Sequence, residues 1–183
     1  MWKLALIGAG TVALAIISRS SLLHPRSHGF TRVLAWEGIL GLFTLNVDHW
    51  FINPFSWQQI ISWFLLIDAL VPLILGVSKL RAEGRQKNDA RVDSSLYKFE
   101  KTTKLVTDGI YHYIRHPLYS SLLLLSWGIF FKLPSLAGGA LAVATSLLLL
   151  MTAIRDEREC IGFFGDEYRV YMKGTRRFIP FLF

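Results

Sequence analysis

Five long apolar runs constrain this sequence more than any other feature. They cover residues 2–18, 33–52, 57–80, 118–133 and 136–154, with polar segments between them. A transmembrane helix needs about 20 mostly apolar residues, and the runs approach or reach that length. The chain is 52% hydrophobic and 18% charged, a balance that excludes an ordinary soluble domain. We therefore expect an all-α integral membrane protein: a single membrane domain over residues 1–183, with about five transmembrane helices and a cytoplasmic C-terminal amphipathic helical segment.

The first apolar run has two interpretations. A cleaved signal peptide also carries a short apolar core after a basic residue. Here the only basic residue is Lys3, and no small-x-small cleavage site comes after Ile17, which favours a retained helix. Residues 8–13 match the dinucleotide-binding pattern G-x-G-x-x-A, but no strand precedes them, so the glycines indicate close helix packing instead.

The distribution of basic residues predicts the orientation in the membrane. The chain has 20 Lys and Arg against 13 Asp and Glu. Lys3 and Lys132 fall on one side of the expected helices, and the others lie in residues 19–32, in residues 79–117 or in the tail. The positive-inside rule then places the N-terminus outside and the C-terminus in the cytoplasm, in the plasma or inner membrane of a bacterium. Because the charge lies in loops, we expect membrane lipids as partners and no nucleic acid.

Several polar residues outside the main motifs have plain interpretations. Cys160 is the only cysteine, which excludes a disulfide framework and favours a small helix-packing residue. His24 and His28 flank Pro25 in a polar stretch, so we expect both to face solvent. Five histidines are too few for a membrane di-iron centre, and we predict no metal site. The charged segment 81–103 is expected to be a solvated loop, with a short amphipathic helix possible at 95–101.

The densest polar and aromatic cluster runs from residue 104 to residue 119. Asp108 and Gly109 form a turn signal, and Pro117 suits the first turn of a helix. A turn leading into a helix start offers free backbone N–H groups that can bind a carboxylate. The tyrosines of this block, Tyr111, Tyr113 and Tyr119, offer aromatic faces that attract a cationic centre.

A second polar block, residues 155–177, comes directly after the last apolar run. Asp156, Glu157 and Glu159 stand at its start, where carboxylates can hold ribose hydroxyls or an ammonium group. Five spans would place both blocks on the same side of the membrane. Together they offer groups for a cation with a ribose and an amino-acid end, a description that S-adenosylmethionine fits.

These residues carry a family resemblance. The stretch Leu105-Val-Thr-Asp-Gly-Ile-Tyr-His-Tyr-Ile-Arg-His-Pro-Leu-Tyr119 resembles the signature L-V-T-x-G-x-Y-x-x-x-R-H-P-x-Y of the isoprenylcysteine carboxyl methyltransferase and phospholipid methyltransferase superfamily. Asp156-Glu157, Phe164-Gly165-Asp-Glu-Tyr168, Tyr171 and Arg177-Phe-Ile-Pro180 are similar to its second block. The resemblance covers roughly residues 80 to 180, so that residues 1–80 would form three N-terminal spans and residues 81–183 the catalytic core.

The resemblance implies a methyltransferase that binds S-adenosylmethionine at the cytoplasmic surface and methylates a lipophilic acceptor. It implies catalytic roles for His116 and Arg115. Carried over by position, the cofactor-binding residues are Lys104, Leu105, Val106, Tyr111, His116, Pro117, Leu118, Tyr119, Asp156 and Glu157.

Two departures from the family pattern bear on the cofactor and the acceptor. Asp156 is one methylene shorter than the usual glutamate, which leaves open whether Asp156 or Glu157 contacts the cofactor. Thr152 stands where eukaryotic members carry an arginine for the prenylcysteine carboxylate, so the acceptor stays open among carboxylates, thiols and amines, with a phospholipid N-methyltransferase as the alternative. Two other classes remain: a nicotinamide-dependent membrane reductase and a non-catalytic lipid-binding membrane protein.

Overall fold

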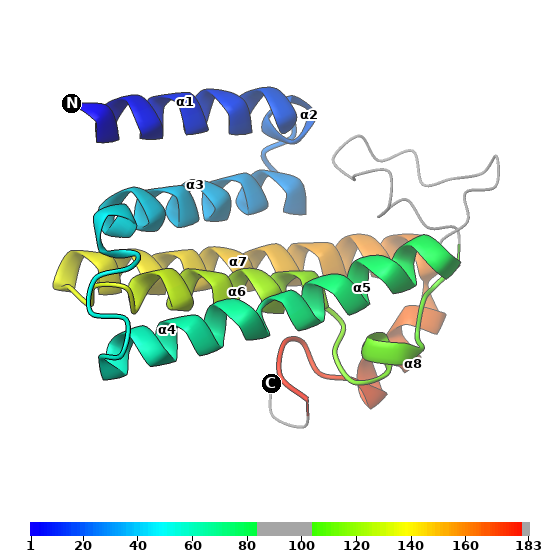
Figure 1. Ribbon diagram of the computed structural model, residues 1–183. Coiled ribbons are helices and arrows are strands. Elements are labelled where there is room, and N and C mark those ends of the chain that lie inside the picture. Colours follow the sequence, from blue (N-terminus) through cyan, green and yellow to red (C-terminus); the bar gives the residue numbers. More distant parts are fainter. Residues whose placement is uncertain (84–103, 181–183) are drawn as a thin grey trace.

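The computed structural model describes residues 1–83 and 104–180, and within them the chain is helical apart from one isolated β-bridge (Figure 1). The α-helices are α1 (Trp2–Ile17), α2 (Arg19–Leu22), α3 (His28–Asn46), α4 (Trp57–Asp68), α5 (Leu70–Glu83), α6 (Pro117–Phe130), α7 (Leu136–Phe164) and α8 (Asp166–Gly174), and the 3₁₀ turns are η1 (Val47–His49) and η2 (Gly109–His112). The expected all-α architecture is confirmed for these residues.

The long helices lie side by side around α7 and α6 (Figure 1). Helix α3 packs along α7, α4 and α5 pack against α6, and α1 covers the outer side of α3. Leu42, Ile129 and Ala142 form a buried apolar centre where α3, α6 and α7 meet. The two predicted polar blocks lie at the same end of the helices, and the second block includes α8 (Figure 1).

Small residues permit the closest helix contacts. A Cβ atom added at Gly38 of α3 would collide with Thr145 Oγ1 of α7. One added at Gly76 of α5 would lie 2.8 Å from a methyl carbon of Leu118. Any larger side chain at either position would push the helices apart, so these glycines set the distances at which the site residues are held.

Within residues 1–83 and 104–180, two helical segments are long and apolar enough to cross a membrane. They are Trp57–Glu83, which joins α4 and α5, and Leu136–Phe164, which is α7. Trp2–Ile17 and Pro117–Phe130 are apolar but shorter. At 1.5 Å per residue the 14 residues of α6 extend about 21 Å, less than the roughly 30 Å of a hydrocarbon core. The predicted run 33–52 overlaps α3, but α3 ends at Asn46 and is not among these apolar segments. The five-span topology and its orientation stay predictions.

Two sequence expectations about boundaries were wrong. The last long helix does not end at residue 154 but continues to Phe164, because its polar side chains find partners inside the protein. The stretch before residue 33 is not all loop: it contains α2, and His28 begins α3, where its side chain is buried rather than solvent-facing. His24 is exposed, as expected. The possible helix at 95–101 lies outside the described residues.

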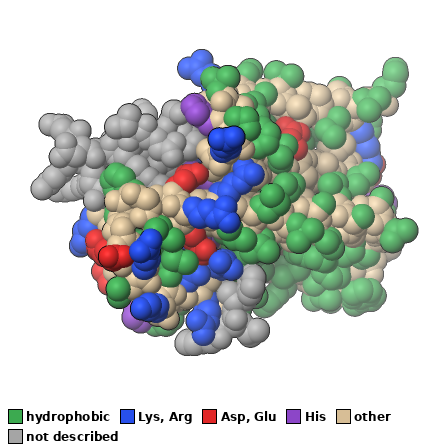
Figure 2. Space-filling model, turned by 180° about the vertical axis from the view of Figure 1, so that it is seen from behind, with side chains coloured by type: hydrophobic (Ala, Val, Ile, Leu, Met, Phe, Trp, Pro, Cys, Tyr) green, Lys and Arg blue, Asp and Glu red, His purple; other side chains and the backbone are tan. Residues whose placement is uncertain are grey.

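Charged and apolar surfaces separate along the molecule. Figure 2 shows basic and acidic side chains gathered mainly at one end and green apolar side chains over much of the rest. Exposed apolar residues on α4 and α5 include Phe64, Ile67, Val71 and Ile74. Apolar patches of this extent on a soluble monomer are unusual, and they fit helices that face lipid.

Candidate active site

The first block forms a wall because its backbone pairs with the end of the chain. Gly109 takes a positive φ of 63° at the start of η2, which a glycine adopts without strain. The backbone N–H of Arg115 then donates to the carbonyl of Arg176 at 2.7 Å, and that of His116 donates to Arg177 at 3.0 Å. Pro117 occupies the first turn of α6, where no amide donor is needed.

A second glycine folds the other block over the first. Gly165 has φ 60° and ψ −131°, which ends α7 and turns the chain into α8. Tyr168 and Tyr171 of α8 are thereby brought opposite the first block, and the Tyr171 hydroxyl donates to the Tyr111 carbonyl oxygen at 2.6 Å. Burial raises the pKa of Tyr171, so this hydroxyl stays protonated and the bond stays a donor bond at any physiological pH.

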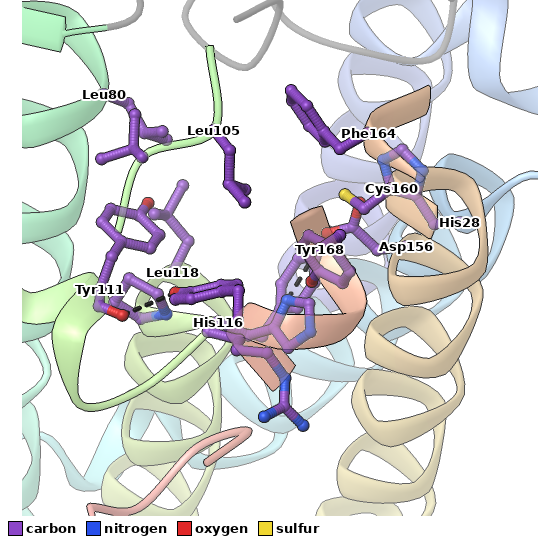
Figure 3. Close-up of a pocket in the computed structure, with 15 residues that line it drawn as sticks. His28, Leu80, Leu105, Tyr111, His116, Leu118, Asp156, Cys160, Phe164 and Tyr168 are labelled. Carbon is purple, nitrogen blue, oxygen red and sulfur yellow. Dashed lines mark hydrogen bonds and ion pairs between the residues drawn. The ribbon is translucent and has the colours of Figure 1, made fainter. Parts of the chain in front are cut away.

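A cavity lies between the two blocks (Figure 3). Its volume is about 110 Å³. Its lining is His28, Leu80, Leu105, Val106, Tyr111, Arg115, His116, Pro117, Leu118, Tyr119, Asp156, Cys160, Phe164, Tyr168 and Tyr171. In Figure 3, Leu80 and Tyr111 stand on one side and Asp156, Cys160 and His28 on the other, so helices far apart in sequence share one cavity.

A buried group of charges supports the floor of this cavity. Glu157 is 4% exposed and accepts from Arg115 Nε at 2.9 Å and from Arg177 Nη2 at 3.0 Å. Arg115 also donates to the carbonyl oxygens of Met172 and Thr175, which closes the end of α8. We call Arg115, His116, Glu157 and Arg177 the block cluster. Arg115 and Arg177 are hydrogen-bonded to Glu157, as charged groups removed from water require. His116 Nε2, by contrast, is buried 3.5 Å from Glu157 without a hydrogen bond to any described residue.

His116 sits between this cluster and the cavity. Its Nδ1 lies 3.5 Å from Asp156 Oδ2 and its Nε2 lies 3.5 Å from Glu157 Oε1. Its ring stacks on Tyr119 with centroids 5.3 Å apart. Burial opposes the charged form, but the two carboxylates outweigh it, so the pKa of His116 is raised and the imidazolium is favoured.

The structure brings most of the predicted cofactor residues together and leaves two apart. Eight of them line the cavity: Leu105, Val106, Tyr111, His116, Pro117, Leu118, Tyr119 and Asp156. Lys104 is exposed outside it, and Glu157 is held in the block cluster. Of the pair of carboxylates that the sequence left open, Asp156 is the one that faces the cavity.

Both residues of the predicted catalytic pair line the cavity. The Nε and Nη1 groups of Arg115 donate to Glu157 and to the end of α8, which holds its guanidinium in place. The catalytic roles of His116 and Arg115 stay predictions.

Sequence reasoning missed His28 and Leu80 as lining residues. Neither belongs to a motif, and only the packing of α3 and α5 beside α7 and α6 brings them to the cavity. Cys160, interpreted as a packing residue, also lines it, with Sγ 3.6 Å from Asp156 Oδ1. Phe164, Tyr168 and Tyr171 line it as well, and their spacing of four and three residues is the signal that could have found them.

The lining suits S-adenosylmethionine. Tyr111, Tyr119 and Tyr168 offer aromatic faces, which attract a sulfonium as they attract other cations. Asp156 offers a carboxylate that can accept from ribose hydroxyls or an ammonium group. Leu105 and Leu118 provide apolar surface for a purine ring.

Comparison with known proteins agrees with this chemistry. A family model described as phospholipid methyltransferase matches residues 87–163. A stretch of 76 residues, 40% of this chain, is 32% identical to methanethiol S-methyltransferase 1 of Bradyrhizobium diazoefficiens, and 79 residues, 43% of the chain, are 28% identical to methanethiol S-methyltransferase of Crocosphaera subtropica. The matched stretches span 25% and 30% of those two proteins' lengths. No solved structure matches.

Proposed function

We propose that this chain, whose residues 87–163 match the phospholipid methyltransferase family, transfers a methyl group from S-adenosylmethionine to a lipophilic acceptor at the cytoplasmic membrane surface. The observation that carries the proposal is the cavity itself. Two polar blocks separated by the 35 residues 120–154 converge on it, and between them they supply tyrosine faces, one carboxylate and apolar walls. The cofactor of this family supplies a methyl group on a positively charged sulfonium.

The protein's residues act by alignment and by excluding water. Methyl transfer is an in-line displacement that removes the positive charge, so it needs reacting atoms held in line more than it needs an acid. The His116–Tyr119 stack and the Tyr171–Tyr111 bond fix the walls of the cavity. Arg115 and Glu157 lock the backbone that carries His116, so the wall is rigid before any ligand binds.

The acceptor is the open part of the proposal. Both relatives are named as methyltransferases of a thiol, which supports a thiol, and the family's name supports a phospholipid amine. A second, apolar groove of about 940 Å³ runs along α6 on the other side of the first block, with Leu123, Leu124 and Phe178 in its lining. A small thiol needs only the cavity between Leu80 and His28, whereas a long-chain lipid has this groove available for its tails.

The test uses the full chain purified in detergent. Titration calorimetry with S-adenosylhomocysteine should show binding, and labelled methyl uptake should be found with one member of a panel of alkanethiols, phosphatidylethanolamine and a prenylcysteine. Tyr111→Ala should weaken S-adenosylhomocysteine binding by about tenfold or more, because a buried aromatic face is worth about 2 kcal/mol to a cation and more with its packing. The matched control is Tyr113→Ala, since Tyr113 lies two residues away but is 51% exposed and outside the cavity.

The same titration separates the alternatives. Binding of NADPH in place of S-adenosylhomocysteine would make the protein a reductase, and binding of neither would make it a non-catalytic membrane protein. Equal loss of affinity in Tyr111→Ala and Tyr113→Ala would remove the site assignment.

A further inference from the structure

His28 brings a titratable group to the cavity from a part of the chain that no motif covers. It is the first residue of α3, well before the family match begins at residue 87. Its side chain is 1% exposed, yet it lines the cavity on the side of Asp156 and Cys160 (Figure 3). A histidine buried against a binding cavity needs an explanation beyond packing, because burial works against its charged form.

Glu159 fixes which nitrogen of His28 carries the proton. One Glu159 oxygen accepts from the His28 backbone N–H at 2.8 Å, and the other lies 2.5 Å from ring Nδ1. A carboxylate at Nδ1 requires a hydrogen on that nitrogen, so in the neutral ring the lone pair is on Nε2. Serine hydrolases hold their histidine base in the same way, with a carboxylate on one nitrogen and the reacting group at the other.

We propose that His28, held at Nδ1 by Glu159, is the general base that takes the proton from a neutral thiol acceptor. This rests on the proposed function and narrows its acceptor to a thiol. The acceptor sulfur forms a bond to the methyl carbon as the bond from that carbon to the sulfonium sulfur breaks, and the electron pair of the broken bond stays on the leaving sulfur. The S–H proton passes to His28 Nε2 and then to solvent, so charge and protons balance.

The acidity of the groups favours a thiol over the other acceptors. A thiol ionises near pH 8.5, within about two units of a histidine, whereas an alkyl ammonium ionises near 10.4 and a carboxylic acid has no proton to lose at neutral pH. Burial lowers the pKa of His28, but Asp156 and Glu159 outweigh both burial and the nearby Arg32, so the pKa is raised and the neutral imidazole is a stronger base. A stronger base takes the proton of a weakly acidic thiol more effectively.

His116 fits this role less well. A carboxylate lies 3.5 Å from each of its ring nitrogens, and among residues 1–83 and 104–180 its buried Nε2 has no hydrogen-bond partner. The two carboxylates favour the charged ring, which has no lone pair to accept a proton from an acceptor. Within the described part of the chain, His28 has a carboxylate hydrogen-bonded at Nδ1 only. The two histidines therefore have different roles: His116 forms part of the cavity wall, and His28 takes the proton from the acceptor.

The test compares two thiols of different acidity. His28→Asn keeps an amide donor where Nδ1 stood, so it can still bond Glu159, but it has no basic nitrogen. Methylation of n-hexanethiol should fall about 100-fold or more, as expected for a lost general base, while that of pentafluorothiophenol, already ionised at neutral pH, should change by less than about threefold. Binding of S-adenosylhomocysteine, measured by titration calorimetry, should stay at the wild-type value. His24→Asn is the matched control, because His24 is exposed in the preceding loop, and it should match the wild type with both thiols.

Each other outcome overturns the role of His28 as the base, the thiol acceptor or the proposed function. Equal loss with both thiols, or no loss with either, would show that His28 is not the base. Wild-type protein that binds S-adenosylhomocysteine but methylates neither thiol would overturn the thiol inference and leave the proposed function standing, whereas absence of that binding would overturn both. If His28→Asn loses the binding, Glu159→Gln is compared instead, since it keeps the imidazole but releases its tautomer, and the same dependence on thiol acidity is required.

Discussion

The two ends of the helix bundle bury charge in opposite ways. At one end stands the block cluster, in which Glu157 is enclosed by Arg115, His116 and Arg177. At the other end Lys132, in the turn between α6 and α7, is 2% exposed, and its ammonium contacts neutral groups. One end balances charge with charge, and the other surrounds a single cation with dipoles and rings.

The surroundings of Lys132 explain how that end is stable. Its ammonium donates to Gln59 Oε1 at 3.0 Å and lies 3.5 Å from the ring centroid of Trp63 and 5.1 Å from that of Trp50. We call Trp50, Gln59, Trp63 and Lys132 the turn cluster. Gln59 also donates to the carbonyl oxygen of Lys132 at 3.1 Å, so the cluster ties the start of α4 to the end of α6. Lys132 lines neither of the two cavities described above.

The difference shows when a buried charge indicates a function. His116 of the block cluster and its neighbour Asp156 both line the cavity, so their charges can act on a bound ligand. In the turn cluster the lysine's contacts are with packing residues. A buried charged group with a shifted pKa indicates a functional site only when it also borders a cavity that a ligand can enter.

Removing the centre of the block cluster should have the largest effect of any single change. Glu157→Gln leaves the guanidinium groups of Arg115 and Arg177 without their carboxylate and leaves His116 with Asp156 alone. Breaking a buried ion pair in this way costs about 3–5 kcal/mol. Denaturant unfolding in detergent should show that loss, and S-adenosylhomocysteine binding should weaken with it. The matched control is Glu167→Gln, because Glu167 is an exposed carboxylate on α8. A variant as stable as the wild type would show that the cluster is not what holds the two blocks together.

The pH dependence of His116 should be the next largest effect. Its pKa in the folded protein is raised above the ordinary 6.5, so its contribution to stability is complete below pH 6.5 and is lost as the pH rises through the folded value. The stability advantage of the wild type over His116→Gln should therefore shrink as the pH rises above 6.5. Thermal unfolding of both proteins over a series of rising pH values measures it. An advantage that grows with pH would contradict the ion pairs with Asp156 and Glu157.

Much of the fold could be predicted from the apolar runs alone, and the errors have a physical cause. Runs of apolar residues indicate where helices lie. A run ends at the first polar residues, however, whereas the helix continues for as long as its backbone hydrogen bonds do. Helix α7 continues past residue 154 because Arg155, Asp156 and Glu157 find partners in other segments, and Arg155 donates to the carbonyl oxygen of Pro25 at 2.9 Å. A single sequence cannot show such partners.

The candidate site was predictable only where local motifs carry it. The cavity-facing positions of the first block come from the family pattern and from Gly109 and Pro117, which shape a local turn. Asp156 and Glu157 are adjacent in sequence, but helical geometry sends them to different sides, one to the cavity and one to Arg115. His28 was out of reach, since its role depends on a contact with Glu159, 131 residues away.

Replacing the buried lysine should affect stability less than replacing the buried glutamate. Lys132→Met keeps the apolar stem and removes a charge whose burial is itself unfavourable, so the free energy of unfolding at pH 7 should equal or exceed that of the wild type. Burial lowers the pKa of Lys132 to about 8, so the unfolded chain binds more protons than the folded one between about pH 8 and 10.5, and the wild type should gain stability on the variant over that range. The advantage of the wild type over the variant thus rises with pH for Lys132, whereas it falls with pH for His116. A loss of several kcal/mol at pH 7 would show that the two clusters are not different in kind.

The smallest effect should come from an exposed ion pair at the same end as the turn cluster. Lys3 Nζ lies 2.7 Å from Asp48 Oδ2, but the two side chains are 36% and 49% exposed. Water and salt screen such a pair, and it contributes less than about 1 kcal/mol. Asp48→Asn should therefore change the unfolding midpoint in denaturant only slightly, the change should vanish in high salt, and S-adenosylhomocysteine binding should be unaffected. The Lys3–Asp48 pair differs from the block cluster in being exposed to water. If Asp48→Asn lost as much unfolding free energy as Glu157→Gln, independently of salt, burial would not be what makes the block cluster important for stability.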